Sequence, residues 1–182
     1  MANGFLTSSP GSRHGDQVSD IVATSVASKF TCPGSGTQEI SEIGMWLSAD
    51  SSTAAAFRLA IYTHDAVNNN PNTMVANSES AELTHNTTSV VKKSHTYGTK
   101  PQLTGGTVYW LARNHADSNS NQDRLSGGGA VFVDSDVGGY PTWATAAQWD
   151  AGSEWDDDVG IYAVYQAAGG SGNPWYYYAQ QQ

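Results

Sequence analysis

Basic residues, long apolar runs and cysteine are all scarce in this chain. Eight Lys and Arg stand against seventeen Asp and Glu, which gives a formal net charge of -9. Because neutralising phosphates supplies most nonspecific affinity for nucleic acid, this charge argues against DNA and RNA as partners. It argues equally against anionic membrane surfaces, and no stretch approaches the roughly 20 consecutive apolar residues of a spanning helix. We therefore expect neither a nucleic-acid partner nor a membrane.

Cysteine occurs only at Cys32, so we expect no disulfide framework and a buried structural thiol. The first ten residues also lack the cationic start and the apolar stretch of a secretory signal. Both features predict synthesis in a reducing cytoplasm without a signal peptide.

Aliphatic side chains are few as well, since Leu, Ile, Val and Phe together number 29 of 182 residues. Such a low share raises the question of disorder. Six Trp and nine Tyr answer it, because each large aromatic side chain buries about 150–250 Å². We expect one domain with a core of few but large side chains.

Strand signals are plentiful and recur at short intervals, with turn residues between them. The strongest is 103–112, where a Gly-Gly turn leads into a β-branched and aromatic run. A second, 57–62, is followed by the loop 63–73, in which Pro71 cannot continue a central strand. The best helical segment, 141–148, allows one or two turns only, because glycines lie on both sides. We predict strands over residues 21–30, 38–47, 57–63, 74–83, 89–97, 107–113, 130–133 and 159–166.

This pattern predicts an all-β fold, a single antiparallel β-sandwich. We expect an N-terminal arm over 1–18, the sandwich over 19–168 and a glycine-hinged aromatic tail over 169–182. Alternate residues in a strand share a face. On that basis we expect a single core formed by Trp46, Phe57, Leu59, Ile61, Val108, Trp110 and Val164.

Five segments spread over roughly residues 20 to 165 carry a resemblance to known proteins. They are Lys29–Gly36 (KFTCPGSG), Ile40–Trp46 (ISEIGMW), Phe57–Tyr62 (FRLAIY), Pro71–Ser78 and Leu103–Ala112. In these segments the chain resembles the jelly-roll modules of phage decoration and tail proteins and of secreted carbohydrate-binding proteins. The resemblance implies a sandwich of jelly-roll type, located on a virion or an extracellular surface. Because such folds host unrelated functions, the site residues must decide between a structural role and sugar binding.

The last segment combines a flexible Gly-Gly-Ser-Gly hinge with four consecutive aromatics, Trp175, Tyr176, Tyr177 and Tyr178. Trp and Tyr are enriched in interface hot spots, and four exposed aromatics would form an apolar patch that soluble proteins avoid. These residues are therefore the predicted subunit contact, in a homo-oligomer or with a capsid or tail protein. Two alternatives stay open at this point: a terminal strand on the chain's own sheet, and a tail that stacks on a ligand.

A second group of aromatic and acidic residues points to a polysaccharide partner instead. Indole rings stack on the C–H faces of sugars, while carboxylates accept hydrogen bonds from hydroxyls. The carbohydrate-binding residues predicted on this alternative are Trp143, Trp149, Trp155, Asp150 and Asp156. An ordinary acidic turn before the strand at 159 explains the same residues, and a calcium site is a further alternative.

Motifs for catalysis and cofactors are missing. Asp117, Asn119, Asn121 and Asp123 supply oxygens at alternate positions, as in the first half of a calcium loop, but Gln122 stands where that loop needs glycine. The five histidines show no paired spacing on a helix, so no zinc site is predicted. The Gly-Ser-Gly segments lack the spacing of a nucleophile elbow. We expect no cofactor, no enzymatic activity and, at most, a weak calcium site.

Overall fold

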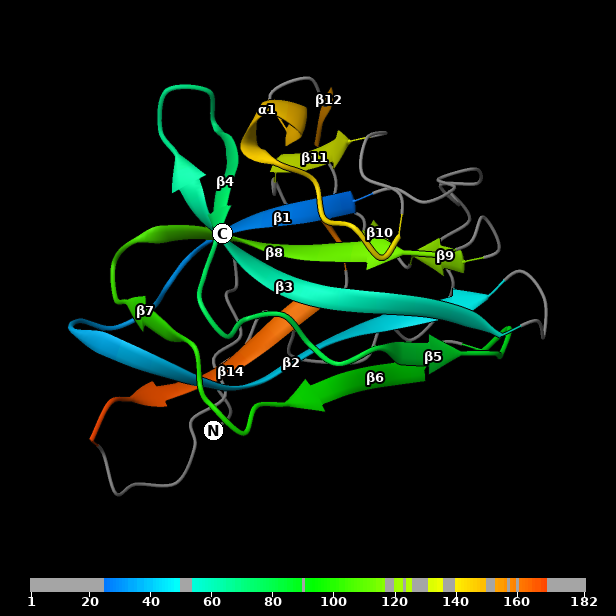
Figure 1. Cartoon of the computed structure of the whole chain (residues 1–182), viewed down its shortest axis with the longest axis horizontal. Coiled ribbons are helices and arrows are strands. Elements are labelled where there is room, and N and C mark those ends of the chain that lie inside the picture. The colour runs from blue at the N-terminus through cyan, green and yellow to red at the C-terminus, as the bar shows by residue number, and fades with distance from the viewer. Residues whose placement is uncertain are drawn as a thin grey trace.

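The structure is a computed structural model, and it describes residues 25–49, 54–89, 91–116, 120–122, 124–125, 131–135, 140–149, 153–156, 158–159 and 161–169. Every strand pair in these ranges is antiparallel. The strands form two main sheets, and in Figure 1 the strands β1, β8 and β3 of one sheet lie above β14, β2 and β6 of the other. The predicted all-β sandwich is confirmed, and its jelly-roll subtype stays a prediction.

The larger sheet has the order β12-β11-β1-β8-β3-β4, and β5 pairs with the first part of β3. Its strands are β1 (Ser25–Thr31), β3 (Ala55–Asp65), β4 (Asn70–Met74), β5 (Leu83–His85), β8 (Val108–His115), β11 (Val131–Ser135) and β12 (Ser153–Asp156).

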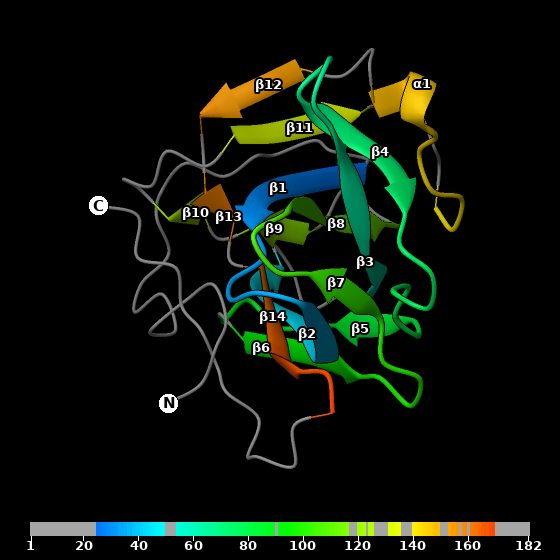
Figure 2. The ribbon, with the colours of Figure 1, turned by 90° about the vertical axis from the view of Figure 1, so that its left-hand side faces the viewer.

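The smaller sheet is built around β2, the longest strand, with β14 on one side and β6 on the other. In Figure 2, turned by 90°, β14, β2 and β6 of this sheet lie below β11, β1 and β8 of the larger sheet. Its strands are β2 (Thr37–Ala49), β6 (Val91–Thr96), β7 (Gln102–Thr104), β9 (Ser120–Gln122) and β14 (Ile161–Ala167), and a separate short pair joins β10 (Arg124–Leu125) to β13 (Asp158–Val159).

The main core lies between the two sheets. Phe57, Leu59 and Ile61 alternate along β3 and are fully buried in one cluster, as predicted. The smaller sheet contributes Ile40, Ile43, Met45, Leu47, Ile161, Ala163 and Tyr165 to the same cluster.

A β-bulge in β2 explains why Ile40 and Ile43 both face this core although they are three residues apart. The register against β14 shifts at this point, so that Val164 pairs with Glu42 while Tyr165 pairs with Ile40. Ser41 is the extra residue, and one inserted residue reverses the side-chain alternation beyond it.

Four predicted core residues lie outside this cluster, and that part of the prediction is wrong. Trp110 is fully buried on the opposite face of the larger sheet, and Val108 is half-buried. Trp46 is half-buried against Tyr162, and Val164 is buried but belongs to neither core cluster. The reason is that β8 is buried on both faces, so alternation alone cannot tell which face meets the other sheet.

The second face of the larger sheet forms its own small core around Trp110. Ala27, Ala112 and Ala60 lie in one register row across β1, β8 and β3, and their small side chains leave room for large rings nearby. Trp149 occupies this face and is buried in the same cluster as Trp110.

The helix α1 (Ala146–Trp149) brings Trp149 to this face. Its start carries a capping contact, because the backbone N–H of Thr145 donates to Oε1 of Gln148 at 2.7 Å. A short helix is therefore present as predicted, but it covers 146–149 rather than the predicted 141–148. No helix in the described ranges is long and apolar enough to cross a membrane.

The predicted loop over 63–73 is shorter than expected. β3 continues to Asp65, and β4 begins at Asn70 and includes Pro71, which lies opposite His64. Proline is tolerated there because β4 is the edge strand of the sheet, where a missing N–H interrupts no central ladder.

Candidate functional site

β4 and β5 pair with the two ends of one side of β3. Between them, two serines hydrogen-bond to the β3 backbone in place of a strand. The hydroxyl of Ser78 accepts from the N–H of Ile61 at 3.1 Å and donates to its carbonyl at 3.0 Å. The Leu59 N–H donates to the hydroxyl of Ser80 at 2.9 Å, and the Ser80 N–H donates to the Leu59 carbonyl at 2.7 Å. Both serines are buried, so the residues between and after them point outward.

This arrangement corrects the predicted strand over 74–83. The alternation of small and polar residues is present, but Asn77 has a φ of +61°, in the left-handed region that an extended strand excludes. The segment therefore hydrogen-bonds through side chains as well as backbone, and it presents Glu79 and Glu82 at the surface.

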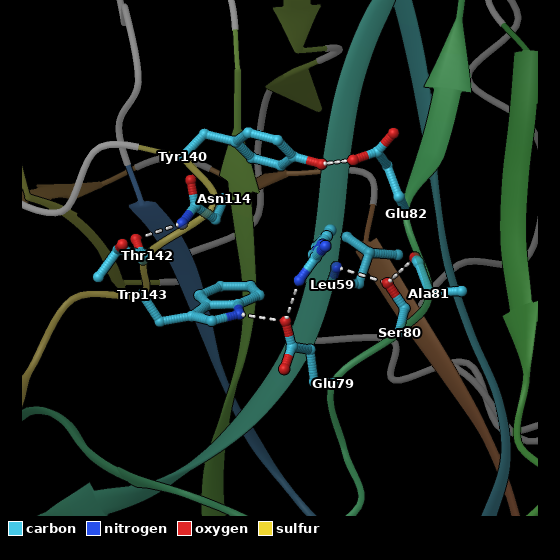
Figure 3. A network of polar contacts seen from close by, with 10 residues as sticks. Leu59, Glu79, Ser80, Ala81, Glu82, Asn114, Tyr140, Thr142 and Trp143 are labelled. Carbon is cyan, nitrogen blue, oxygen red and sulfur yellow. Dashed lines mark hydrogen bonds and ion pairs between the residues drawn. The ribbon is translucent and has the colours of Figure 1, made fainter.

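Glu79 is the centre of a polar network on this surface (Figure 3). Its Oε1 accepts from Nη1 of Arg58 on β3 at 2.9 Å and from Nε1 of Trp143 at 3.1 Å. The hydrogen bond from Arg58 to Glu79 is the main reason that the pKa of Arg58 is raised. The carboxylate thus joins β3 to the segment before α1.

Tyr140 forms the second half of the network. Its hydroxyl donates to Oε2 of Glu82, and the guanidinium of Arg58 lies 5.8 Å from the centre of its ring. Partial burial raises the pKa of Tyr140, and the hydrogen bond to Glu82 and its charge raise it further. We call Arg58, Glu79, Glu82, Tyr140 and Trp143 together the Glu79 surface.

Three further contacts hold the segment 140–149 on the sheet. Nδ2 of Asn114 donates to the Thr142 carbonyl at 2.6 Å (Figure 3), and the Tyr62 hydroxyl donates to the Ala144 carbonyl at 3.4 Å. The ring of Trp143 packs against Tyr62 with the ring centres 5.9 Å apart. Burial of Tyr62 raises the pKa of its hydroxyl, which therefore stays a donor.

The Glu79 surface has the chemistry to hold a neutral ligand rich in hydroxyl groups. Among the described residues, both hydrogen bonds of the exposed Glu79 go to Oε1, which leaves Oε2 available as an acceptor. Half-exposed rings of Tyr140 and Trp143 stand beside it, and such rings stack on apolar ligand faces. The same contacts also fasten the segment 140–149 to the larger sheet.

Of the predicted carbohydrate-binding residues, the structure places Trp143 on this surface and Trp149 in the core. Trp149 is 1% exposed, so its ring offers no face to a sugar, and its prediction as a stacking platform is wrong. Hydrophobic packing against Trp110 and Tyr62 explains its presence in the sequence.

The other predicted site residues lie wholly or partly outside the described residues. The backbones of Trp155 and Asp156 belong to β12, and that of Asn121 to β9, but their side chains are not described. The remainder lie outside altogether: Asp150, Asp117, Asn119, Asp123, Trp175, Tyr176, Tyr177 and Tyr178. Within the described part of the chain, no group of three or more His, Cys, Asp or Glu side chains could hold a metal ion.

No protein-family model, curated protein or solved structure matches this chain. The site must therefore be interpreted from its own chemistry.

Sequence reasoning missed Arg58, Glu79, Glu82 and Tyr140. The available signal was the alternation Ser78-Glu79-Ser80, in which buried hydroxyls flank an outward carboxylate. Only the fold brings this segment within reach of Tyr140 and Trp143, which lie some sixty residues later in the sequence.

Proposed function

We propose that this protein is a non-catalytic structural subunit of a phage-like virion or filament, which binds a neighbouring subunit through its C-terminal aromatic tail. The observation that carries the proposal is the position of β14. This strand pairs with β2 on one side, and no second strand lies beside it among the described residues. An edge strand of this kind can accept a further strand.

β14 is also unusually well buried for an edge strand. All five residues from Ile161 to Tyr165 are buried, so side chains on both faces are covered. Because the chain itself covers both faces of β14, a neighbouring subunit would meet only the hydrogen-bonding edge of this strand. This supports an added strand beside β14 in the functional form of the protein.

The tail begins just after β14 ends and has enough residues to pair along the whole of this strand. Gly169, just beyond β14, has a φ of +75°, which turns the chain away from an extended course. Six residues later comes Trp175, and six extended residues span about 20 Å, close to the length of a seven-residue strand at about 23 Å. The thirteen residues 170–182 are thus enough for a strand as long as β14, and we propose that this strand comes from a neighbouring copy.

Deleting residues 170–182 tests this proposal. We expect the truncated protein to keep the far-ultraviolet circular dichroism of a β-sandwich and to lose its oligomeric state, measured by sedimentation velocity. Removing only Ala179–Gln182 is the matched control, because it shortens the tail and keeps all four aromatics. That control should assemble like the full chain.

The opposite pattern would contradict the subunit contact. If the tail is a strand of its own sheet, its deletion lowers the melting temperature by about 2–4 °C for each kcal/mol lost while the oligomer persists. A full chain that sediments as a monomer at all concentrations would also contradict self-association.

Carbohydrate binding is the second candidate function, and the Glu79 surface favours it. Half-exposed rings of Tyr140 and Trp143 next to the exposed Glu79 carboxylate match what a pyranose ring requires. The partner on this proposal is a neutral polysaccharide on an extracellular surface.

Replacing Trp143 by alanine tests this second function. We expect at least a tenfold loss of affinity for whichever polysaccharide a glycan array identifies, because stacking and water exclusion are both removed. Trp46→Ala is the matched control, since Trp46 is also half-buried but lies on the smaller sheet. Equal binding by both variants, or no binding by the wild type, would remove this candidate.

A further inference from the structure

Two histidines meet in the interior at one end of the sandwich. His85 on β5 and His115 at the end of β8 are both 0% exposed, and their Nε2 atoms lie 3.4 Å apart. The ring centres are 5.6 Å apart, so the rings approach through their Nε2 edges rather than face to face. The pair links β5 to β8 across the intervening β3, whose Ala55 and Phe57 pair with the two histidines.

The surroundings of this pair are apolar and cationic. Phe57 stacks on His115 with an interplanar angle of 19° and meets His85 edge-on. The charged groups that act on His85 are Arg113, buried on β8, and Lys93 on β6. β3 presents an aromatic ring there and no titratable group.

A hydrogen bond between two Nε2 atoms requires the accepting ring to be neutral. One ring must carry its hydrogen on Nε2 and the other must present a lone pair. Nδ1 of His85 is buried and has no hydrogen-bond partner among the residues that the structure describes. We therefore assign the donor to His85 Nε2 and the acceptor to His115 Nε2, because a hydrogen on Nδ1 of His85 would be a buried donor without an acceptor.

Acid destabilises the buried pair wherever the additional proton is added. A proton on Nε2 of His115 removes the acceptor. A proton on Nδ1 of His85 leaves the hydrogen bond in place but creates a buried cation close to Arg113. Besides this pair, β5 is held by its pairing with residues 55–57 of β3 and by the partly buried Leu83, which packs against the main core.

We propose that the His85–His115 hydrogen bond is an acid-sensitive latch, which holds β5 against the sandwich at neutral pH and releases it when a ring is protonated. Figure 1 shows β5 alongside β6 at the lower edge of the sandwich. Release of β5 would therefore open the core at that edge while the central strands β1, β3 and β8 stay paired.

The pH range of the latch follows from the difference between the pKa of the buried His85 ring and the pKa of the released ring. Burial, and then the charges of Arg113 and Lys93, lower the pKa of His85 from 6.5 to about 4. The released ring binds protons from about pH 6.5 downward, whereas the buried ring does not, so falling pH favours release between these two values. At pH 5 the released fraction should be about 30-fold larger than at pH 7.5.

Hydrogen–deuterium exchange of the full chain at pH 7.5 and pH 5.0 tests the latch, after correction for the intrinsic rates. We expect the peptide containing Leu83–His85 to lose protection by about 30-fold in the wild type, while the peptide over 108–112 keeps it. In His85→Gln the side-chain amide takes a position near that of Nε2 and does not titrate. The additional loss of exchange protection at pH 5.0 should therefore disappear in this variant. His95→Gln, a half-buried histidine on β6, is the control and should behave like the wild type.

Protection of β5 that is equal at the two pH values in the wild type would overturn the latch. The same pH-dependent loss in His85→Gln would also overturn it. If His85→Gln does not fold, the imidazole resonances of the wild type decide: His85 must stay neutral in the folded protein down to about pH 5, and titration near pH 6.5 would refute the proposal.

Discussion

Replacing Trp110 by alanine should lower the free energy of unfolding by about 3–5 kcal/mol, the usual cost of removing a fully buried large aromatic side chain. Trp110 is 0% exposed, and its Nε1 donates to Nδ1 of His64 at 3.1 Å. The cavity would lie beside Trp149 in the same cluster. Urea denaturation monitored by circular dichroism measures the loss.

The position of Trp110 adds a second expectation to this variant. Because the ring packs on the face that α1 covers, the residues of α1 should lose protection against hydrogen exchange more than the core strand β2 does. Trp46→Ala is a suitable comparison, because removing that half-buried ring should lower the free energy of unfolding by less. An unchanged melting temperature in Trp110→Ala would contradict the burial of this residue.

Replacing Gly105 by alanine should cost up to about 3 kcal/mol, at the upper end of what overpacking costs. A Cβ atom at this position would lie 2.6 Å from the carbonyl oxygen of Gly34, which is backbone and cannot rotate away. The N–H of Gly105 also donates to the Gly36 carbonyl at 2.7 Å. The substitution would force apart the two turns at one end of β2 and β8.

Two other glycines provide matched comparisons for Gly105→Ala. Gly106 has open space around it but a φ of +79°, so alanine there should cost about 1 kcal/mol through backbone strain alone. Gly98 has open space and no positive φ, and alanine should change stability by less than about 0.5 kcal/mol. Equal melting temperatures for Gly98→Ala and Gly105→Ala would show that the two turns are not in close contact.

Local sequence signals predicted a strand well where a single segment carries a β-branched and aromatic run. The runs around Phe57–Tyr62 and Val108–Ala112 are β-branched and aromatic, and both lie inside strands. The segment after Met74 shows the limit of such signals. Its alternation resembles a strand, but a left-handed Asn77 and two buried hydroxyls satisfy the β3 edge in another way.

The candidate site was predicted only in part. Trp143 was recognised because an indole ring near carboxylates is a local feature of the sequence. Trp149 was assigned to the same site although it is buried, because two tryptophans six residues apart look alike until the packing of α1 is known. Glu79 and Glu82 lie far from them in sequence, and no local pattern connects the two segments.

The sequence by itself determined the all-β class, the approximate strands and the acidic character of the surface, because side-chain alternation, β-propensity, turn residues and charge are properties of short segments. Only the tertiary structure decided which face of β8 meets the smaller sheet, because both faces are buried. It alone brought Glu79 to Trp143 and His85 to His115, since these contacts join segments at least thirty residues apart. Such pairings depend on strand order and register, which form through long-range packing rather than local preference.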